Sequence, residues 1–241
     1  MKVTEIFRSV QGEGIYTGKP AVFVRLAGCN LKCSWCDTRY SSWELTEFEE
    51  VQIDDLLSKI IEFDVGLVIF TGGEPCLQSK ELITLCEKLK IYKVKIHIET
   101  NGTIFDNKLI KMIDFWSINP KLSSSTNQCG LVPFKIKIIK KIINKLPIDK
   151  YQLKFVISED NMNQDIIEVE QIIKKSKMKH NANIIFQPEG TSTDIVHYSS
   201  KCANLAEILV INQMHYIMKQ FSNARVLSQM HKFFWWNKRK I

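Results

Sequence analysis

Short apolar runs rich in β-branched residues alternate with stretches of helical periodicity along the chain. The run "AVFVRLAG" (21–28) is typical of a buried strand, and residues 51–63 place apolar side chains at helical spacing. Further strands are predicted over 66–75, 93–100, 115–120, 151–158 and 183–190, helices over 79–89, 106–114, 133–146 (with Pro133 at its start), 164–176 and 202–220, and a last extended piece over 224–231. Strands joined by single helices form a parallel sheet with right-handed crossovers.

The pattern contains about six βα units, which is too few to close an eight-stranded barrel. We therefore expect an α/β fold built as an open, partial parallel βα barrel. A flat doubly wound sheet is the alternative, and the pattern alone does not separate the two. No long linker interrupts the units, so residues 1–241 are predicted to form a single domain. The hydrophobic content of 45% is enough to bury its core.

Polar residues follow the predicted strands at the points where the strands end. They are Cys29–Thr38 after the first strand, Thr71–Glu74 after the second, Glu99–Asn101 after the third, Ser117 and Asn119 after the fourth, and Gln187 after the sixth. In parallel βα folds, ligands bind at the carboxyl ends of the strands. We therefore expect the chemistry to take place at this one rim of the sheet.

Three of the seven cysteines, Cys29, Cys33 and Cys36, fall within eight residues in the spacing C-x3-C-x2-C. A closed structural zinc site takes four protein ligands, and no further Cys or His lies nearby; Cys76 can reach the site only through a tertiary contact. A cubane iron–sulfur cluster is usually held by four cysteines, so three leave one iron open to an external molecule. An open [4Fe–4S] cluster is the favoured interpretation, and zinc and unliganded thiols are the alternatives.

The formal net charge is +7, and excess lysine lies in residues 135–145 and in the carboxyl-terminal tail. These lysines are either solvated helix faces or a surface that attracts nucleic acid, an acidic substrate or an acidic protein. No apolar run approaches the length of a membrane span, and the amino-terminal residues do not resemble a signal peptide. We therefore expect a cytoplasmic protein that does not bind a membrane.

The cysteine spacing, with an aromatic residue, Trp35, before the last cysteine, resembles the cluster loop of the radical S-adenosylmethionine (radical SAM) enzymes. "TGGEP" (71–75) resembles the turn that binds the methionine amino group in that superfamily, and "SINPK" (117–121) and "FQPEG" (186–190) lie where its members contact ribose and adenine. The resemblance implies SAM as cofactor. The residues expected to bind it are Trp35, Asp37, Gly72, Gly73, Glu74, Glu99, Ser117, Asn119, Pro120, Lys121 and Gln187.

A narrower resemblance covers both ends of the chain. Q-G-E-G (11–14), F-V-R-L-x-G-C (23–29), W-C-D-T (35–38) and the tail from Arg225 are similar to the 7-carboxy-7-deazaguanine synthase family. It implies a carbon–nitrogen lyase that converts 6-carboxy-5,6,7,8-tetrahydropterin into 7-carboxy-7-deazaguanine with release of ammonia, on the route to queuosine. It also implies Mg²⁺ and a homodimer. "GEGIYTGK" (12–19) lacks the spacing of a phosphate-binding loop.

Residues of both ends match substrate and metal contacts of that family. Thr38 matches the Mg²⁺ ligand, and a hydroxyl is a hard oxygen donor that suits this ion; helix capping is its structural alternative. Residues 1–20 are expected to be a lid over the rim, and residues 222–241 a segment that closes the pocket. The expected substrate contacts are Val10, Gln11, Gly12, Glu13, Arg25, Thr71, Gln229 and His231. Trp235 and Trp236 are expected either in the pocket wall or in a dimer core.

Arg25 lies in an otherwise apolar strand, so its guanidinium needs an anion. The substrate carboxylate is the expected partner, and a salt bridge to Asp37 or Glu74 is the alternative. Asp37 and Glu99 are expected to position the sulfonium of SAM or to tune the cluster, and neither is assigned as the sole general base.

Two other functions remain possible from the sequence. A glycyl-radical enzyme activating protein shares the cysteine loop but needs no pterin-sized pocket. A metal-stapled nucleic-acid-binding protein would use the positive charge, whereas the favoured function requires no nucleic acid. Under the favoured function, a basic surface within 135–145 is expected to bind an acidic, flavodoxin-like electron donor.

Overall fold

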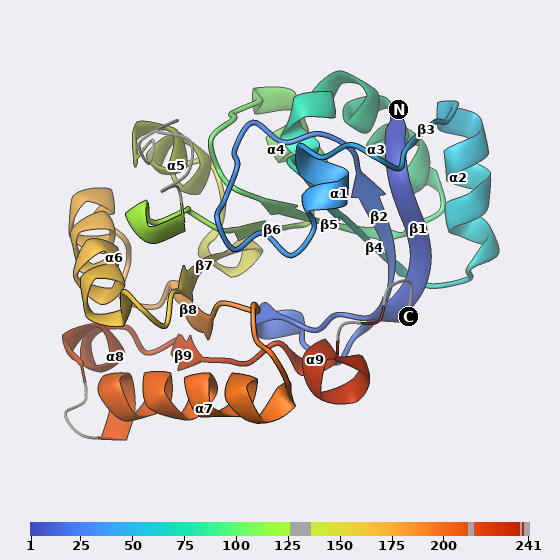
Figure 1. Cartoon of the computed structure of the whole chain (residues 1–241). Coiled ribbons are helices and arrows are strands. Elements are labelled where there is room, and N and C mark those ends of the chain that lie inside the picture. Colours follow the sequence, from blue (N-terminus) through green and yellow to red (C-terminus); the bar gives the residue numbers. More distant parts are fainter. Residues whose placement is uncertain (126–135, 212–214, 237, 239–241) are drawn as a thin grey trace.

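The structure is a computed structural model and describes residues 1–125, 136–211, 215–236 and 238. Its strands form one sheet in the order β3-β1-β2-β4-β5-β6-β7-β8-β9 (Figure 1). The strands are β1 (Lys2–Val10), β2 (Pro20–Leu26), β3 (Glu49–Glu50), β4 (Leu67–Gly72), β5 (Lys95–Thr100), β6 (Phe115–Ile118), β7 (Tyr151–Ile157), β8 (Asn183–Pro188) and β9 (Ala224–Val226). The sheet is parallel from β2 through β9, apart from the antiparallel β1 and β3 at one end. The prediction of an open, partial βα barrel is confirmed.

Helices follow the parallel strands, and most of them cover the outside of the sheet (Figure 1). They are α1 (Arg39–Ser42), α2 (Ile53–Glu62), α3 (Ser79–Ile91), α4 (Asn107–Met112), α5 (Ile136–Ile143), α6 (Met162–Ser176), α7 (Ile195–Ala206), α8 (Tyr216–Gln220) and α9 (Met230–Trp235). Each residue of β7 and β8 is buried, because these strands are covered by other parts of the chain on both faces. The helix start predicted at Pro133 lies outside the described residues.

The single helix predicted over 202–220 is wrong. Helix α7 begins earlier, at Ile195, and continues as a π-helical turn over Glu207–Ile211. A separate helix, α8, begins after His215, whose backbone is extended (φ −57°, ψ 145°) and whose imidazole accepts a hydrogen bond from the N–H of Ile217. A side-chain cap of this kind starts a helix and does not continue one. The extended piece predicted over 224–231 is likewise shortened to β9, since α9 begins at Met230.

Strand β1 determines where the turn that contains Q-G-E-G (11–14) lies in space. It pairs with β2 in an antiparallel register that joins Val10 to Pro20, so residues 11–19, the floor turn, lie at the amino ends of the parallel strands. Within this turn, the N–H of Ile15 donates to Oε1 of Gln152 near the start of β7 at 2.9 Å. The ring of Tyr16 packs edge-on against His97 and Phe115, near the starts of β5 and β6.

The expectation of a lid over the rim is therefore wrong in position. Residues 2–10 are a strand of the sheet, and Gln11 and Gly12 lie at the end of the barrel opposite the rim. The physical reason is the hairpin itself, because a strand antiparallel to β2 must turn at the amino end of β2. The floor turn lies at the amino ends of the parallel strands, whereas a lid over the rim would lie at their carboxyl ends.

The open seam of the barrel, between β9 at one edge of the sheet and the β3–β1 pair at the other, is bridged by the start of α9. The N–H of Met230 donates to the carbonyl of Gly12 at 2.8 Å, and Nε2 of Gln229 donates to Oε1 of Glu13 at 2.6 Å. A Cβ at Gly12 would lie 2.2 Å from Nδ1 of His231, so only glycine allows this close approach. The floor turn and the start of α9 thus contact each other directly.

Candidate functional site

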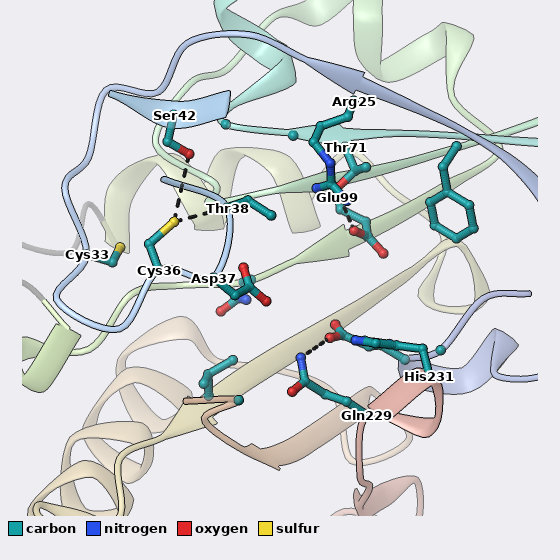
Figure 2. Close-up of a pocket in the computed structure, with 18 of the residues that line it drawn as sticks. Arg25, Cys33, Cys36, Asp37, Thr38, Ser42, Thr71, Glu99, Gln229 and His231 are labelled. Carbon is teal, nitrogen blue, oxygen red and sulfur yellow. Dashed lines mark hydrogen bonds between the residues drawn. The ribbon is translucent and has the colours of Figure 1, made fainter. Parts of the chain in front are cut away.

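One large cavity, of about 760 Å³, occupies the inside of the partial barrel, and its lining reaches from the cysteine loop (residues 27–38) at the rim to the floor turn. This volume lies in the range of pockets that enclose small ligands and cofactors. Figure 2 shows Cys33 and Cys36 across the cavity from Gln229 and His231. The sequence-predicted site residues that line it are Val10, Gln11, Gly12, Glu13, Arg25, Cys29, Cys33, Trp35, Cys36, Asp37, Thr38, Thr71, Gly72, Gly73, Glu99, Ser117, Asn119, Lys121, Gln187, Gln229 and His231.

The cysteine loop presents its three thiols to one end of this cavity. The N–H of Leu31 donates to Sγ of Cys29 at 3.4 Å, and Sγ of Cys36 lies 3.7 Å from Oγ1 of Thr38 and 3.8 Å from Oγ of Ser42 (Figure 2). Burial raises the pKa of Cys29 to about 11 and also raises the pKa of Cys33. Both thiols are therefore protonated at neutral pH until a metal group displaces their protons.

The donor set fits an iron–sulfur cluster with one iron left open. Cys29, Cys33 and Cys36 are the only cysteines among the described residues that line the cavity, and His231, which also lines it, lies at the opposite end. Cys76 is buried outside it, with its Sγ 3.7 Å from Oγ1 of Thr100. The described residues contain no group of three His, Cys, Asp or Glu side chains arranged around a single metal ion.

The turn after β4 packs directly against the start of the cysteine loop. The N–H of Glu74 donates to the carbonyl of Gly28 at 2.7 Å, and the N–H of Gly73 donates to that of Leu26 at 3.1 Å. A Cβ at Gly73 would lie 2.0 Å from the carbonyl oxygen of Gly28, and Gly72 has a φ of +121°. Two glycines are therefore required for this contact, which fixes the position from which Cys29 projects.

Two residues predicted to bind SAM do not line the cavity. The carboxylate of Glu74 is buried behind it and accepts hydrogen bonds from the N–H groups of Cys76 and Asn101 and from Oγ1 of Thr100, at 2.7–3.0 Å. Burial raises the pKa of Glu74, and these hydrogen bonds oppose that rise. Glu74 thus links the turn after β4 to the loop after β5 through hydrogen bonds. Pro120 also lies outside the lining, although its neighbours Asn119 and Lys121 contribute to it.

Thr38 faces the cavity beside Asp37 (Figure 2). It occupies the position before α1, but its side chain makes no capping hydrogen bond. The capping alternative is therefore wrong, and its hydroxyl oxygen instead lies 3.7 Å from Sγ of Cys36.

Arg25 has an internal anionic partner that the sequence did not indicate. Its Nε donates to Oε2 of Glu5 on β1 at 2.9 Å, and the hydroxyl of Tyr40 donates to the same oxygen at 3.3 Å. The alternative partners, Asp37 and Glu74, are wrong, because the β1–β2 pairing places Glu5 directly beside Arg25. Arg25 also lines the cavity, and a guanidinium has five N–H donors, so the pair with Glu5 leaves donors for a bound anion.

Two predicted residues from separate segments contact Glu99, which is itself a predicted site residue. Its Oε1 accepts a hydrogen bond from Nε2 of Gln11 at 2.9 Å, and its Oε2 accepts one from Oγ1 of Thr71 at 2.7 Å (Figure 2). The floor turn, β4 and β5 are joined in this way, and the carboxylate of Glu99 is held between the rim and the floor.

The floor of the cavity is built around Glu13. Its carboxylate accepts hydrogen bonds from Nζ of Lys154 and from Nε2 of Gln229. Burial alone would raise the pKa of Glu13, but the charges of Lys154 and His231 and these hydrogen bonds lower it from 4.5 to about 2. Glu13 is therefore an anion at every pH at which the protein is expected to work.

Lys154 is the main cavity residue that the sequence interpretation missed. It lies in β7, "YQLKFVI", whose other residues are uncharged and all buried. A lone cation in a buried strand is the same signal that singled out Arg25, so it was available from the sequence. Lys232 also lines the cavity, as do Trp235 and Trp236, which places the two tryptophans in the cavity wall.

No helix among the described residues is both long and apolar enough to cross a membrane.

Comparison with known proteins identifies relatives of this chain. The model of the radical SAM superfamily matches residues 24–145. The 7-carboxy-7-deazaguanine synthase of Thermoplasma acidophilum is 31% identical over 233 residues, which are 96% of each chain. That of Hyperthermus butylicus is 45% identical, over 43% of this chain and 44% of the relative. The crystal structure of QueE from Escherichia coli has a TM-score of 0.68 at 21% identity and covers 95% of this chain and 94% of that one, which shows a shared fold.

Proposed function

Since this chain belongs to the radical SAM superfamily and, within it, to the 7-carboxy-7-deazaguanine synthase family, we propose that it converts 6-carboxy-5,6,7,8-tetrahydropterin into 7-carboxy-7-deazaguanine and ammonia. It is a radical SAM lyase of 7-deazapurine biosynthesis, and its cofactors are a [4Fe–4S] cluster and S-adenosylmethionine. When bound, they supply the one-electron chemistry that removes a hydrogen atom from the substrate.

A single observation carries the substrate assignment. The cavity that begins at the three thiols ends at a floor of charged and hydrogen-bonding side chains, Glu13, Lys154 and Gln229. A small, polar, planar substrate fits such a space between cofactor and floor. A glycyl-radical enzyme activating protein acts on a large protein, and such a substrate does not require a small cavity whose floor is closed by α9.

The residues of the rim bind the cofactors in this proposal. Cys29, Cys33 and Cys36 hold the cluster, and the backbone of Gly72 and Gly73 binds the amino acid end of SAM. Trp35, Asp37, Ser117, Asn119, Lys121 and Gln187 surround the rest of SAM. They are cavity-lining residues that project from the carboxyl ends of the strands and from the loops that follow them.

The remaining residues bind substrate and metal. Arg25 binds the substrate carboxylate with the N–H groups that Glu5 does not occupy, and the hydroxyl of Thr38 would hold a Mg²⁺ ion, which would supply positive charge beside the bound anion. Gln11, Thr71 and Glu99 contact the middle of the substrate, and Glu13 contacts its far edge. Gln229 and His231 close the cavity from the carboxyl-terminal side.

The test is an anaerobic product assay. The cluster is rebuilt in the purified protein, which is then given SAM, a reductant, Mg²⁺ and 6-carboxytetrahydropterin. We expect 7-carboxy-7-deazaguanine by mass spectrometry and one ammonia for each product. Cleavage of SAM without either product would leave the superfamily assignment intact and refute the substrate.

The proposal extends to the partners and the compartment of the protein. The enzyme works in the cytoplasm as a homodimer, without nucleic acid, and receives its electron from an acidic, flavodoxin-like protein. Helix α5, with Lys137, Lys140 and Lys141, offers a basic surface for that donor. Replacing Lys140 and Lys141 by Glu is expected to slow donor-driven turnover a few-fold and to leave dithionite-driven turnover unchanged. Equal rates with the donor would refute this docking site.

A further inference from the structure

Glu13 is an anion with unused hydrogen-bonding capacity at the floor of the cavity. A carboxylate offers about four acceptor positions, and Lys154 and Gln229 occupy two of them. Glu13 also lines the cavity, so its remaining positions are directed toward a ligand with N–H donors. Burying such an anion without a cation would be costly, which makes its partner, Lys154, essential to the arrangement.

The pairing is unusual because Lys154 is itself buried in the middle of a strand. Its side chain is 7% exposed, and 141 residues separate it from Glu13 in the sequence. Burial lowers the pKa of Lys154, but the carboxylates of Glu13 and Glu99 outweigh burial and raise it overall. The ammonium and the carboxylate therefore stay charged together, and neither is available as a neutral acid or base.

The position of Glu13 and Lys154 at the floor of the cavity determines which part of the substrate lies beside them. The substrate must present its C6 to the cofactors at the rim, and its carboxylate is attached to that same atom. The pyrimidine ring then points away from the cysteine loop, toward the floor, where Glu13 lines the cavity. The edge of that ring carries two adjacent donors, the N3–H and the 2-amino group, which match the two oxygens of one carboxylate.

We propose that Lys154 is a positioning residue that holds Glu13 as the fixed anion that recognises the aminopyrimidinone edge of the substrate. This inference rests on the proposed function. Lys154 acts through Glu13 and does not touch the reacting atoms. It determines the specificity for a 2-amino ring over a 2-oxo ring, because a 2-oxo group would turn an oxygen toward the carboxylate.

The test measures binding, in the absence of SAM so that no turnover occurs. Equilibrium dialysis compares 6-carboxytetrahydropterin with its 2-oxo analogue for wild type, Glu13→Gln, Lys154→Met and the double variant. We expect wild type to prefer the 2-amino compound by about tenfold or more, and both single variants to lose that preference. In the Glu13→Gln background, Lys154→Met should change affinity by less than about twofold, because the two residues act as one unit.

Two further variants separate positioning from folding. Lys154→Arg keeps the charge and is expected to restore part of the preference. Lys150→Met removes an exposed lysine just before β7 and should leave binding unchanged. Lys154→Met leaves the carboxylate of Glu13 buried without a cation and could therefore fail to fold. The double variant contains no unpaired buried charge, so its affinity for the substrate can still be compared with that of Glu13→Gln.

The outcomes are distinguishable from failure of the proposed function. If wild type forms no deazaguanine from 6-carboxytetrahydropterin, the proposed function fails. If wild type is active but Lys154→Met keeps the 2-amino preference, or weakens binding equally with and without Glu13, the role of Lys154 is refuted.

Discussion

The rim and the floor of the cavity are built by different means. At the rim, the cysteine loop and the turn after β4 are joined by a backbone hydrogen bond from Glu74 to Gly28, 46 residues apart in the sequence, and by glycines that permit close approach. At the floor, Glu13, Lys154 and Gln229 are joined by side-chain contacts across 141 and 216 residues of sequence. The rim is therefore joined through the backbone and the floor through side chains, and both connect segments that are distant in the sequence.

The largest expected effect belongs to the rim. Cys33→Ala removes one of three thiols, so the cluster should not assemble and all SAM-dependent activity should be lost. Iron and sulfide content of the reconstituted protein, together with product formation, measure this. Cys202→Ala, a cysteine on α7 outside the cavity lining, is the control and should retain both. A Cys33→Ala protein with full iron and sulfide content and normal activity would show that the rim does not hold the cluster through these three thiols.

The second effect concerns acid stability beneath the floor turn. Burial lowers the pKa of His97 from 6.5 to about 4, so the folded state excludes a proton that the unfolded state binds. Stability from this residue is complete above pH 6.5 and is lost as the pH falls toward 4, by up to about 3 kcal/mol. Urea unfolding of wild type and His97→Gln across this range measures it. The variant should show a flatter dependence; identical slopes would mean that His97 is not excluded from protonation.

Removing the hydrogen bonds of Glu74 between the rim loops should have the next largest effect on stability. Glu74→Gln replaces an acceptor of three hydrogen bonds by an amide that turns N–H groups toward N–H donors, at a cost of about 1–3 kcal/mol. Thermal unfolding measures the loss, and slower cluster assembly should accompany it. Glu81→Gln, an exposed carboxylate on α3, should stay within about 0.5 kcal/mol of wild type. A stable Glu74→Gln protein would show that the backbone alone holds the rim.

The smallest effect on stability is expected from Gln152, an uncharged side chain that joins the floor turn to β6 and β7. Gln152 accepts from the N–H of Ile15 and donates to Oγ of Ser117, so Gln152→Met should cost about 1–2 kcal/mol. Gln164→Met, on the exposed face of α6, is the matched control. If Gln152→Met weakened substrate binding more than Glu13→Gln does, the floor would depend on this neutral link more than on its ion pair.

The sequence predicted the rim better than the floor for a physical reason. Cys29, Cys33 and Cys36 are close in the chain, and their spacing states which ligands share a loop. Gly72 and Gly73 were placed correctly by the same local logic. Glu74, from the same motif, was assigned to the cofactor, because a motif does not state whether a side chain faces the cavity or the protein behind it.

The floor escaped prediction where it depends on strand pairing. The lid was placed at the wrong end of the barrel, since nothing in residues 1–20 states that β1 runs antiparallel to β2. For the same reason Glu5 was overlooked as the partner of Arg25. Lys154 was visible as a lone cation in a buried strand, but its partner Glu13 lies 141 residues away and no local pattern indicates it.

By itself, the sequence determined the alternation of strands and helices, the three-cysteine loop and the residues at the strand ends, because periodicity and short spacings are local properties. Only the tertiary structure decided which side chains face one another across the cavity, which end of the barrel the first turn closes, and how α9 seals the seam. Those features depend on register and on contacts between distant segments, and each arises when the chain folds around its core.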